Sequence, residues 1–366
     1  MDSTLKLTIC FARCGLGPPL SGNRDASPCL PLAKKAGFLG EERFYESNFS
    51  ITSGTLRVAL ERFARNHTAA TWIQKESEMT LIPAPAPCPM CGEFNPVYLA
   101  SRTVSTKEFH LVHCTRCGQH YCDPAPTSEE IRGFYQGDYH GELRQTGDTE
   151  RVFGLKFSRY RDWVVTFLRS GRSIDVGTAT GLFPSLLKAA GFDAEGTEYN
   201  RASAEWGASH YGIRIRVGGL EQIASELNTY DLITMTDVLE HTEHPLHALQ
   251  AASASLKPSG YMLITFPDIS SIESRYQRNL SRLTRRDWIW SCCHIPLHVW
   301  EFTPATARAM FDKAGFDVIG FRRSQVATES FPGIAGLLTC PLTTLKFPLL
   351  ARLYGTQMEF MIKKRP

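Results

Sequence analysis

The segment IDVGTATG, Ile174–Gly181, decides which fold and which kind of ligand site this chain can have. It begins as a short apolar run around one acid, which is typical of a buried strand. A turn with Gly177 and Gly181 follows, and glycine turns of this kind bring backbone close to a nucleotide. A dinucleotide loop, G-x-G-x-x-G, has further glycines, but here Ala179 stands at the second glycine position and Phe183 near where a third would help. The segment therefore predicts a nucleotide-type loop after a strand, without the usual cradle for a pyrophosphate.

The rest of the C-terminal part alternates strand-like and helix-like patterns. Seven short runs read as strands, at 172–177, 192–198, 213–218, 230–236, 261–267, 316–322 and 358–364. Helical patterns lie between them, for example at 181–191, 200–212 and 303–315, and Gly191 and Gly315 stand where helix C-caps are expected. Several strands are apolar on both faces, which favours a sheet covered by helices on both sides. We predict an α/β fold: a doubly wound, mostly parallel seven-stranded sheet.

Bulk composition excludes few classes of protein, but it indicates the cellular compartment. The 366 residues are 43% hydrophobic and 21% charged, with a net charge of +3. This charge is too small to imply a nucleic-acid or membrane partner. No apolar run is long enough to span a bilayer, and the N-terminus lacks a secretory pattern. We expect a cytoplasmic protein with reduced cysteines.

Four of the 11 cysteines form a metal-binding pattern. CPMCG carries Cys88 and Cys91, and CTRCG carries Cys114 and Cys117, with 22 residues between the two pairs. Two C-x-x-C knuckles at this spacing can bring four thiolates to one tetrahedral zinc ion. The glycine after each knuckle allows the tight turn that this requires. Because four protein ligands close the coordination shell, we expect a structural zinc ribbon without catalysis at the metal.

The proline-rich run IPAPAPCP, 82–89, divides the chain. We predict an N-terminal extension at 1–83, a zinc ribbon at 84–124 and the α/β domain at 125–366. The extension is rich in Gly, Pro and Ser apart from one helical pattern. Met79 leaves two interpretations open: a natural start at that methionine, or a poorly ordered extension. Mass spectrometry of the native N-terminus separates them.

Two acids near the loop indicate the kind of cofactor. Asp175 stands two residues before Gly177, which suits a cofactor with a positive ammonium group. Glu198 ends the second predicted strand, where a carboxylate can accept hydrogen bonds from both ribose hydroxyls. Such an acid serves NAD or S-adenosylmethionine equally well. The missing pyrophosphate cradle favours S-adenosylmethionine.

These features resemble the class I S-adenosylmethionine-dependent methyltransferases, whose first motif is an acid followed by x-G-x-G-x-G. TDVLEHTEHPLHALQ (236–250) is similar to the family's fourth strand and next helix, and LKPSGYMLITFPD (256–268) to its fifth strand. HVWEFTPATARAMFDKAGF (298–316) resembles ubiquinone-O-methyltransferase-like and sugar-methyltransferase-like members. The knuckles followed by 124–140 resemble a zinc ribbon fused ahead of this subgroup.

The resemblance implies a Rossmann-like methyltransferase fold and a set of cofactor-binding residues. These are Asp175, Gly177, Ala179, Gly181, Glu198, Gly219, Leu220, Thr236, Asp237 and Val238. The glycines would line the methionine part, Glu198 would hold the ribose, and Gly219 and Leu220 would lie near the adenine. Ala179 departs from the usual glycine, and we expect the loop to persist because alanine adds only a methyl group.

The acceptor side is less defined. Methyl transfer to oxygen or carbon often needs a base, and the candidates are His241 and His298, with His294 behind them. The arginine-rich segment 274–294 is either a solvated helix face or a lid over an anionic acceptor. The apolar insert 331–354 is either a packed excursion or an acceptor or oligomer contact. We expect a small-molecule acceptor, a saccharide or a quinone-like compound.

Two rival functions stay open at the level of sequence. The first is an RNA methyltransferase that grips nucleic acid with the ribbon, which salt-dependent RNA retention would favour. The modest charge and the sequence TDVLEH, without an Asn/Asp-Pro-Pro-aromatic motif, argue against it. The second is a zinc-ribbon scaffold whose methyltransferase fold is inactive, which a lack of cofactor binding would favour.

Overall fold

The computed structural model describes residues 87–94, 96–104, 106–136, 149–284, 293–324 and 355–366. The predicted extension at 1–83 with Met79, the insert at 331–354 and residues 285–292 of the arginine-rich segment lie outside the described residues. The first part of that segment belongs to helix α10, Ile272–Thr284. Among the described residues, no helix is both long and apolar enough to cross a membrane.

The larger sheet has seven strands, and all seven predicted strands are confirmed in it. They are β4 (Gly171–Val176), β5 (Phe192–Glu198), β6 (Arg214–Val217), β7 (Tyr230–Thr236), β8 (Leu256–Pro267), β10 (Phe316–Ser324) and β11 (Gln357–Lys364). Their order is β10-β11-β8-β7-β4-β5-β6. The pairs from β8 to β6 are parallel, whereas β11 runs antiparallel to both of its neighbours. The predicted mostly parallel, doubly wound sheet is therefore confirmed.

The strand order reverses at β4. From β4 the chain moves outward through β5 to β6, and it then returns to place β7 on the other side of β4. Ligands of open α/β sheets bind at such a switch point, beyond the carboxyl ends of the strands. The loop Gly177–Gly181 leaves β4 at this place, and the segment after β7 lies beside it.

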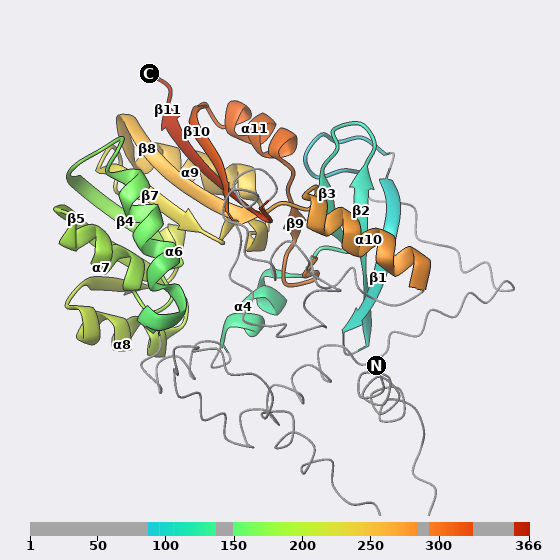
Figure 1. Ribbon diagram of the computed structural model, residues 1–366, viewed down its shortest axis with the longest axis horizontal. Helices are drawn as coiled ribbons and strands as arrows, with labels where there is room; N and C mark the ends of the chain where they lie inside the picture. Colours follow the sequence, from blue (N-terminus) through green and yellow to red (C-terminus); the bar gives the residue numbers. More distant parts are fainter. Residues whose placement is uncertain (1–86, 95, 105, 137–148, 285–292, 325–354) are drawn as a thin grey trace, which may run out of the picture. The chain divides into compact units, whose positions relative to one another are not determined.

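Helices cover both faces of the sheet (Figure 1). One face packs against α6 (Thr149–Val164) and α7 (Leu182–Ala189), with Tyr160, Phe183 and Leu232 in the shared core. The other face packs against α9 (Pro245–Ser255) and α11 (Pro304–Lys313), with Ile233 and Phe311 in the core. Adjacent residues of β7 enter opposite cores because side chains alternate along a strand.

Glycine ends two of these helices as predicted. Gly191 and Gly315 follow the last residues of α7 and α11 with φ of 100° and 85°. Helix α8 (Arg201–Tyr211) is N-capped by Asn200, whose side chain accepts a hydrogen bond from the Ser203 amide. These local signals set the helix limits independently of the core.

The smaller sheet is antiparallel and carries the cysteines. It contains β1 (Pro96–Val104), β2 (Lys107–Cys114), β3 (His120–Asp123) and β9 (Trp300–Glu301), in the order β1-β2-β3-β9. Helix α4 (Ser128–Gln136) follows β3. Strand β9 comes from a segment almost 180 residues further along the chain, a pairing that the sequence analysis did not predict.

Candidate functional site

The loop after β4 has the compact backbone that the sequence predicts. Gly177, Ala179 and Gly181 all have positive φ, at 73°, 53° and 85°. The amide of Gly177 donates to the carbonyl of Thr197 on β5, which ties the start of the loop to the neighbouring strand. Only glycine adopts this region freely, so Ala179 is held there at some conformational cost. The loop persists with alanine at this position, as expected.

Glu198 links the loop to the end of β5. Its carboxylate accepts the amide of Ala179 at 2.8 Å and the amide of Asn200 at 2.8 Å. The residue is buried, and this burial raises its pKa above the usual value. The backbone amide at the middle of the loop is thus paired with a carboxylate.

Gly219 and Leu220 lie close to Glu198 along the same edge. The amide of Gly218 donates to the carbonyl of Glu198, and a β-carbon on Gly219 would overlap the ring of Tyr199. Leu220 begins the short helix η1, Leu220–Gln222. The structure therefore brings the predicted residues 198, 219 and 220 together and adds Tyr199, a half-exposed aromatic side chain that the sequence analysis missed.

Gly207 supports the loop from beneath. It lies in α8, and a β-carbon built there would overlap the carbonyl oxygen of Thr180 and approach Ile215 Cδ1 to 2.9 Å. The contact is with loop backbone, which cannot rotate away. Gly207 has no marker in the sequence, because a glycine inside a helical pattern gives no sign of what it faces.

Asp175 lies inside the sheet at the end of β4. It is 1% exposed, and its Oδ1 accepts a hydrogen bond from Thr234 on β7 at 2.5 Å. Burial raises its pKa to about 7. The residue thus joins the two strands that flank the switch point.

The end of β7 carries a partly buried ion pair. Asp237 accepts hydrogen bonds from Lys156 of α6 at 2.6 Å, from Thr265 of β8 at 3.2 Å, and from Gln357 of β11. Burial works to raise the pKa of Asp237, but the charge and hydrogen bond of Lys156 outweigh it and lower the pKa. Asp237 therefore fixes α6 over the carboxyl ends of the strands.

The residues on either side of Asp237 connect the loop to the next motif. Val238 lies against Gly177, where an added β-carbon would come within 2.8 Å of Val238 Cγ2. Thr236 ends β7 opposite Thr265. Immediately afterwards the chain forms η2, Leu239–His241.

The two histidines predicted as catalytic are brought together. The rings of His241 and His298 meet edge to face, with centroids 4.7 Å apart. His241 Nδ1 lies 2.9 Å from the carbonyl of Leu297, so this nitrogen carries the proton and donates. His298 Nδ1 lies 3.1 Å from Oε1 of Glu301. In both rings Nε2 is left as the basic nitrogen when Nδ1 is the donor.

Burial sets the charge of this cluster. It is the main cause that lowers the pKa of His241 to about 3 and that of His298 to about 4. Burial also raises the pKa of Glu301 to about 7 and that of Glu240 well above its usual range. Neither carboxyl oxygen of Glu240 has a hydrogen-bond partner among the described residues, and Oε1 lies 3.9 Å from His241 Nε2. The cluster thus holds neutral imidazoles beside buried carboxyl groups at neutral pH.

The four predicted metal-ligating cysteines also converge. Cys88 and Cys117 are separated by 3.7 Å between their Sγ atoms, and Cys91 and Cys114 by 3.6 Å. All four sulfur atoms lie within 4.8 Å of one another. Four sulfurs bound tetrahedrally at about 2.3 Å from one zinc ion lie about 3.8 Å apart. The donor set and its spacing fit zinc.

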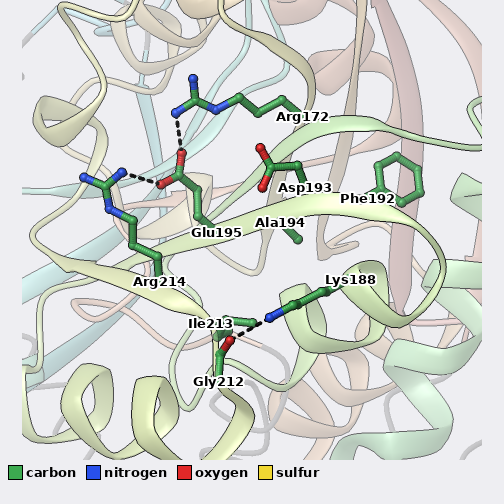
Figure 2. A pocket seen from close by; sticks show the side chains of 9 residues that line it. All are labelled: Arg172, Lys188, Phe192, Asp193, Ala194, Glu195, Gly212, Ile213 and Arg214. Carbon is green, nitrogen blue, oxygen red and sulfur yellow. Dashed lines mark hydrogen bonds and ion pairs between the residues drawn. The ribbon is translucent and has the colours of Figure 1, made fainter.

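A hollow of about 250 Å³ lies away from these residues (Figure 2). Arg172, Glu195 and Arg214 line it, at the amino-terminal halves of β4, β5 and β6. Arg172 and Arg214 approach the Glu195 carboxylate to 3.1 and 3.6 Å, so the charges of the hollow pair with one another. It lies at the opposite end of the strands from the loop and is not part of the candidate site.

Comparison with known proteins places this geometry in a family. Residues 152–320 match a family model described as a methyltransferase domain. The matched segment includes the loop, Glu198 and both histidines. Residues 152–320 are a methyltransferase domain. The strand order, with β11 antiparallel between β10 and β8, agrees with the fold that the resemblance to class I S-adenosylmethionine-dependent methyltransferases implies.

Curated relatives of the methyltransferase domain are ubiquinone biosynthesis O-methyltransferases. That of Bordetella avium (strain 197N) is 28% identical over 163 residues, which is 42% of this chain and 66% of the relative. That of Marinobacter nauticus is 26% identical over 142 residues, 37% of this chain and 58% of the relative. The chain thus spans less than two thirds of the length of either relative.

Solved structures are similar only at a distance. A methyltransferase from Archaeoglobus fulgidus is 17% identical with a TM-score of 0.43, covering 62% of this chain and all of that one. The 1,6-didemethyltoxoflavin-N1-methyltransferase of Burkholderia thailandensis is 12% identical with a TM-score of 0.45, covering 74% and 100%. At these scores the likeness carries no information on substrate.

Proposed function

We propose that the protein transfers a methyl group from S-adenosylmethionine to a hydroxyl oxygen of a small, quinone-like phenolic acceptor. The methyltransferase domain and the ubiquinone biosynthesis O-methyltransferases among its relatives support this class of reaction. The observation that carries the proposal is the ring contact between His298 and His241, which stands three residues after Val238, the residue that lies against the loop. A base and a cofactor loop therefore meet at the switch point.

The cofactor half is assigned to the residues around the loop. Glu198 would accept the ribose hydroxyls, because its carboxylate lies at the end of β5 beside the loop and a carboxylate offers about four acceptor positions. Gly219, Leu220 and Tyr199 would face the adenine, and Gly177, Ala179 and Gly181 would line the methionine part. Asp175, Thr236, Asp237 and Val238 would support this side. When bound, S-adenosylmethionine supplies a methyl group activated by its sulfonium charge.

The position of Glu198 argues against a dinucleotide. A pyrophosphate needs unpaired backbone amides at the start of the helix after the loop. Here the amide of Ala179 already donates to a carboxylate. A pyrophosphate at this place would meet a negative charge where it needs a donor.

In the acceptor half of the site, around His241 and His298, a base must remove a proton from the attacking hydroxyl. We assign this proton to Nε2 of His241, because the Leu297 carbonyl fixes the proton of the same ring on Nδ1. The cation formed on His241 is stabilised by the nearby carboxylates of Asp237 and Glu301, whose negative charges raise the pKa of His241 against the effect of burial. The neutral Glu240 carboxyl, which has no hydrogen-bond partner among the described residues, is a donor for the acceptor oxygen.

The first test measures binding and transfer on the same preparation. Calorimetric titration should show binding of S-adenosylmethionine and none of NAD. Labelled methyl transfer should then be faster to catechol, as a simple phenolic probe, than to a nucleotide-linked sugar. Binding of NAD alone, or of neither compound, contradicts the proposal, and preferential labelling of the sugar overturns the phenolic acceptor.

Replacing Glu198 by alanine should weaken S-adenosylmethionine binding by about 10- to 100-fold. The variant loses hydrogen bonds from a charged group, each worth about 1.5–3 kcal/mol, and frees the Ala179 amide. Calorimetry of the variant measures the change. Glu205→Ala is the matched control, because Glu205 is an exposed acid on α8. Equal affinities of the two variants contradict the role of Glu198.

We further propose that the four cysteines bind one structural zinc ion. Replacing Cys114 by serine should remove the metal and lower the melting temperature markedly, because zinc binding contributes several kcal/mol to the folding of such modules. Elemental analysis and thermal unfolding measure both effects. Cys122→Ser is the control, since Cys122 is buried on β3 outside the knuckles. Zinc retained in Cys114→Ser argues against this ligand.

A further inference from the structure

Strand β9 is held between the cysteine-bearing sheet and the histidine cluster. It has only two residues, Trp300 and Glu301, and pairs with Tyr121 and His120 of β3. A strand this short makes few bonds of its own, so its position depends on what packs against it. The structure contains two sets of contacts that do this, one on each side.

The first set comes from the second cysteine knuckle. Gln119 is fully buried, and its Nε2 donates to the carbonyl of Glu301 at 3.0 Å and to that of His120 at 2.8 Å. Its own backbone belongs to the knuckle, because the Cys114 amide donates to the Gln119 carbonyl at 2.9 Å. One side chain therefore ties the cysteine loop directly to β9.

The second set joins the same segment to η2. The amide of Val299 donates to the Glu240 carbonyl at 2.8 Å, and Trp300 Nε1 donates to the Thr242 carbonyl at 2.9 Å. Residues 297–301 also provide the carbonyl that orients His241 and the carboxylate that contacts His298. Any displacement of β9 thus moves the partners of both histidines.

A continuous apolar core reinforces this connection. Cys88, Cys114 and Tyr121 share one buried cluster with Val299 and Trp300. The cluster extends to the sheet face that α9 and α11 cover. The loop Gly177–Gly181, by contrast, is hydrogen-bonded to β5 and lies against α8.

We propose that Gln119 is a positioning residue for the acceptor half of the site, and that the metal-bound knuckle sets the geometry of the His241–His298–Glu301 cluster through β9. The cysteine-bearing sheet then helps to position residues of the transferase site and is not a separate module. The cofactor half is independent of it. The inference rests on the proposed function for the role of the histidines, but the placement of β9 can be tested without any methyl transfer.

The decisive experiment is hydrogen exchange on the full-length, zinc-loaded chain and its Gln119→Leu variant. Loss of the two donated hydrogen bonds should speed exchange of the amides of 298–302 about tenfold, with β4 and β7 unchanged. Calorimetry should give S-adenosylmethionine affinity within about twofold of the original. Turnover with catechol should fall while the affinity holds, and Gln119→Asn, which keeps the amide, should recover part of it.

Two controls keep the outcome decisive. Ser255→Ala removes another buried donor to a backbone carbonyl, that of Ile223, and should leave 298–302 unchanged. Chelation of zinc from the unsubstituted chain should also speed hydrogen exchange at 298–302. Because this control uses the unsubstituted chain, it decides the question even if Gln119→Leu folds poorly. Exchange at 298–302 that is unchanged in both cases, or cofactor affinity that falls together with turnover, overturns the inference. If the original chain transfers no methyl group, the proposed function fails while the exchange result still decides the role of Gln119.

Discussion

Replacing His241 by alanine is expected to lower the turnover of methyl transfer by about 10²- to 10⁴-fold, the usual contribution of a general base. The structure places the basic nitrogen of His241 in a fixed orientation because Nδ1 donates to the Leu297 carbonyl. The cofactor half does not use this side chain. Affinity for S-adenosylmethionine should therefore stay unchanged, which steady-state kinetics and calorimetry together can establish.

A neighbouring histidine provides the control for this substitution. His244 lies three residues further along, is 60% exposed, and makes no side-chain cap for α9. His244→Ala should leave turnover within about twofold of the original, as expected for an exposed side chain away from the site. If both variants retain full turnover, His241 is not the base, and His298 becomes the candidate to test.

The pH dependence of turnover should follow Glu301 rather than the histidines. Both imidazoles are already neutral above pH 4 to 5, since burial lowers their pKa values to about 3 and 4. Glu301, with a pKa of about 7, is neutral below that pH and charged above it. Only the charged form stabilises the cation formed on His241, so kcat should rise as pH increases through about 7. Glu301→Gln should remove this rise, and a rise that persists in the variant must come from the acceptor.

Gly207→Ala should have the second large effect, on both stability and cofactor binding. The new methyl group would overlap the carbonyl oxygen of Thr180 and lie 2.8 Å from the carbonyl carbon. Either α8 or the loop must move, and overpacking of this kind costs about 1–3 kcal/mol. Because the loop is the less regular partner, we expect its displacement to weaken S-adenosylmethionine binding at least about tenfold.

Thermal unfolding and calorimetry measure these two effects of Gly207→Ala. Gly154→Ala is the matched control, since Gly154 lies in helix α6 with nothing within 4 Å of the added carbon. That change should be neutral or stabilise by up to about 1 kcal/mol through helix propensity. A Gly207→Ala variant as stable as Gly154→Ala, with full cofactor affinity, would show that α8 does not restrain the loop.

The sequence by itself determined the features that depend on local patterns. Apolar runs of strand length, separated by capped helices, specified all seven strands of the larger sheet, because side-chain alternation and helix signals act over a few residues. The C-x-x-C spacing specified the cysteine cluster for the same reason, and Gly177, Gly181 and Glu198 marked the loop and its partner. These predictions needed no knowledge of which distant segments meet.

Only the tertiary structure decided how the two halves of the site are joined. It paired β9 with β3, placed Gln119 on the carbonyl of Glu301, and set His298 against His241, which lies 57 residues earlier in the chain. It also placed Gly207 against the backbone carbonyl of Thr180, and the ammonium group of Lys156 beside the carboxylate of Asp237. None of these contacts has a local signature, because each arises when segments that are far apart in the chain pack into one core and must satisfy one another's buried polar groups.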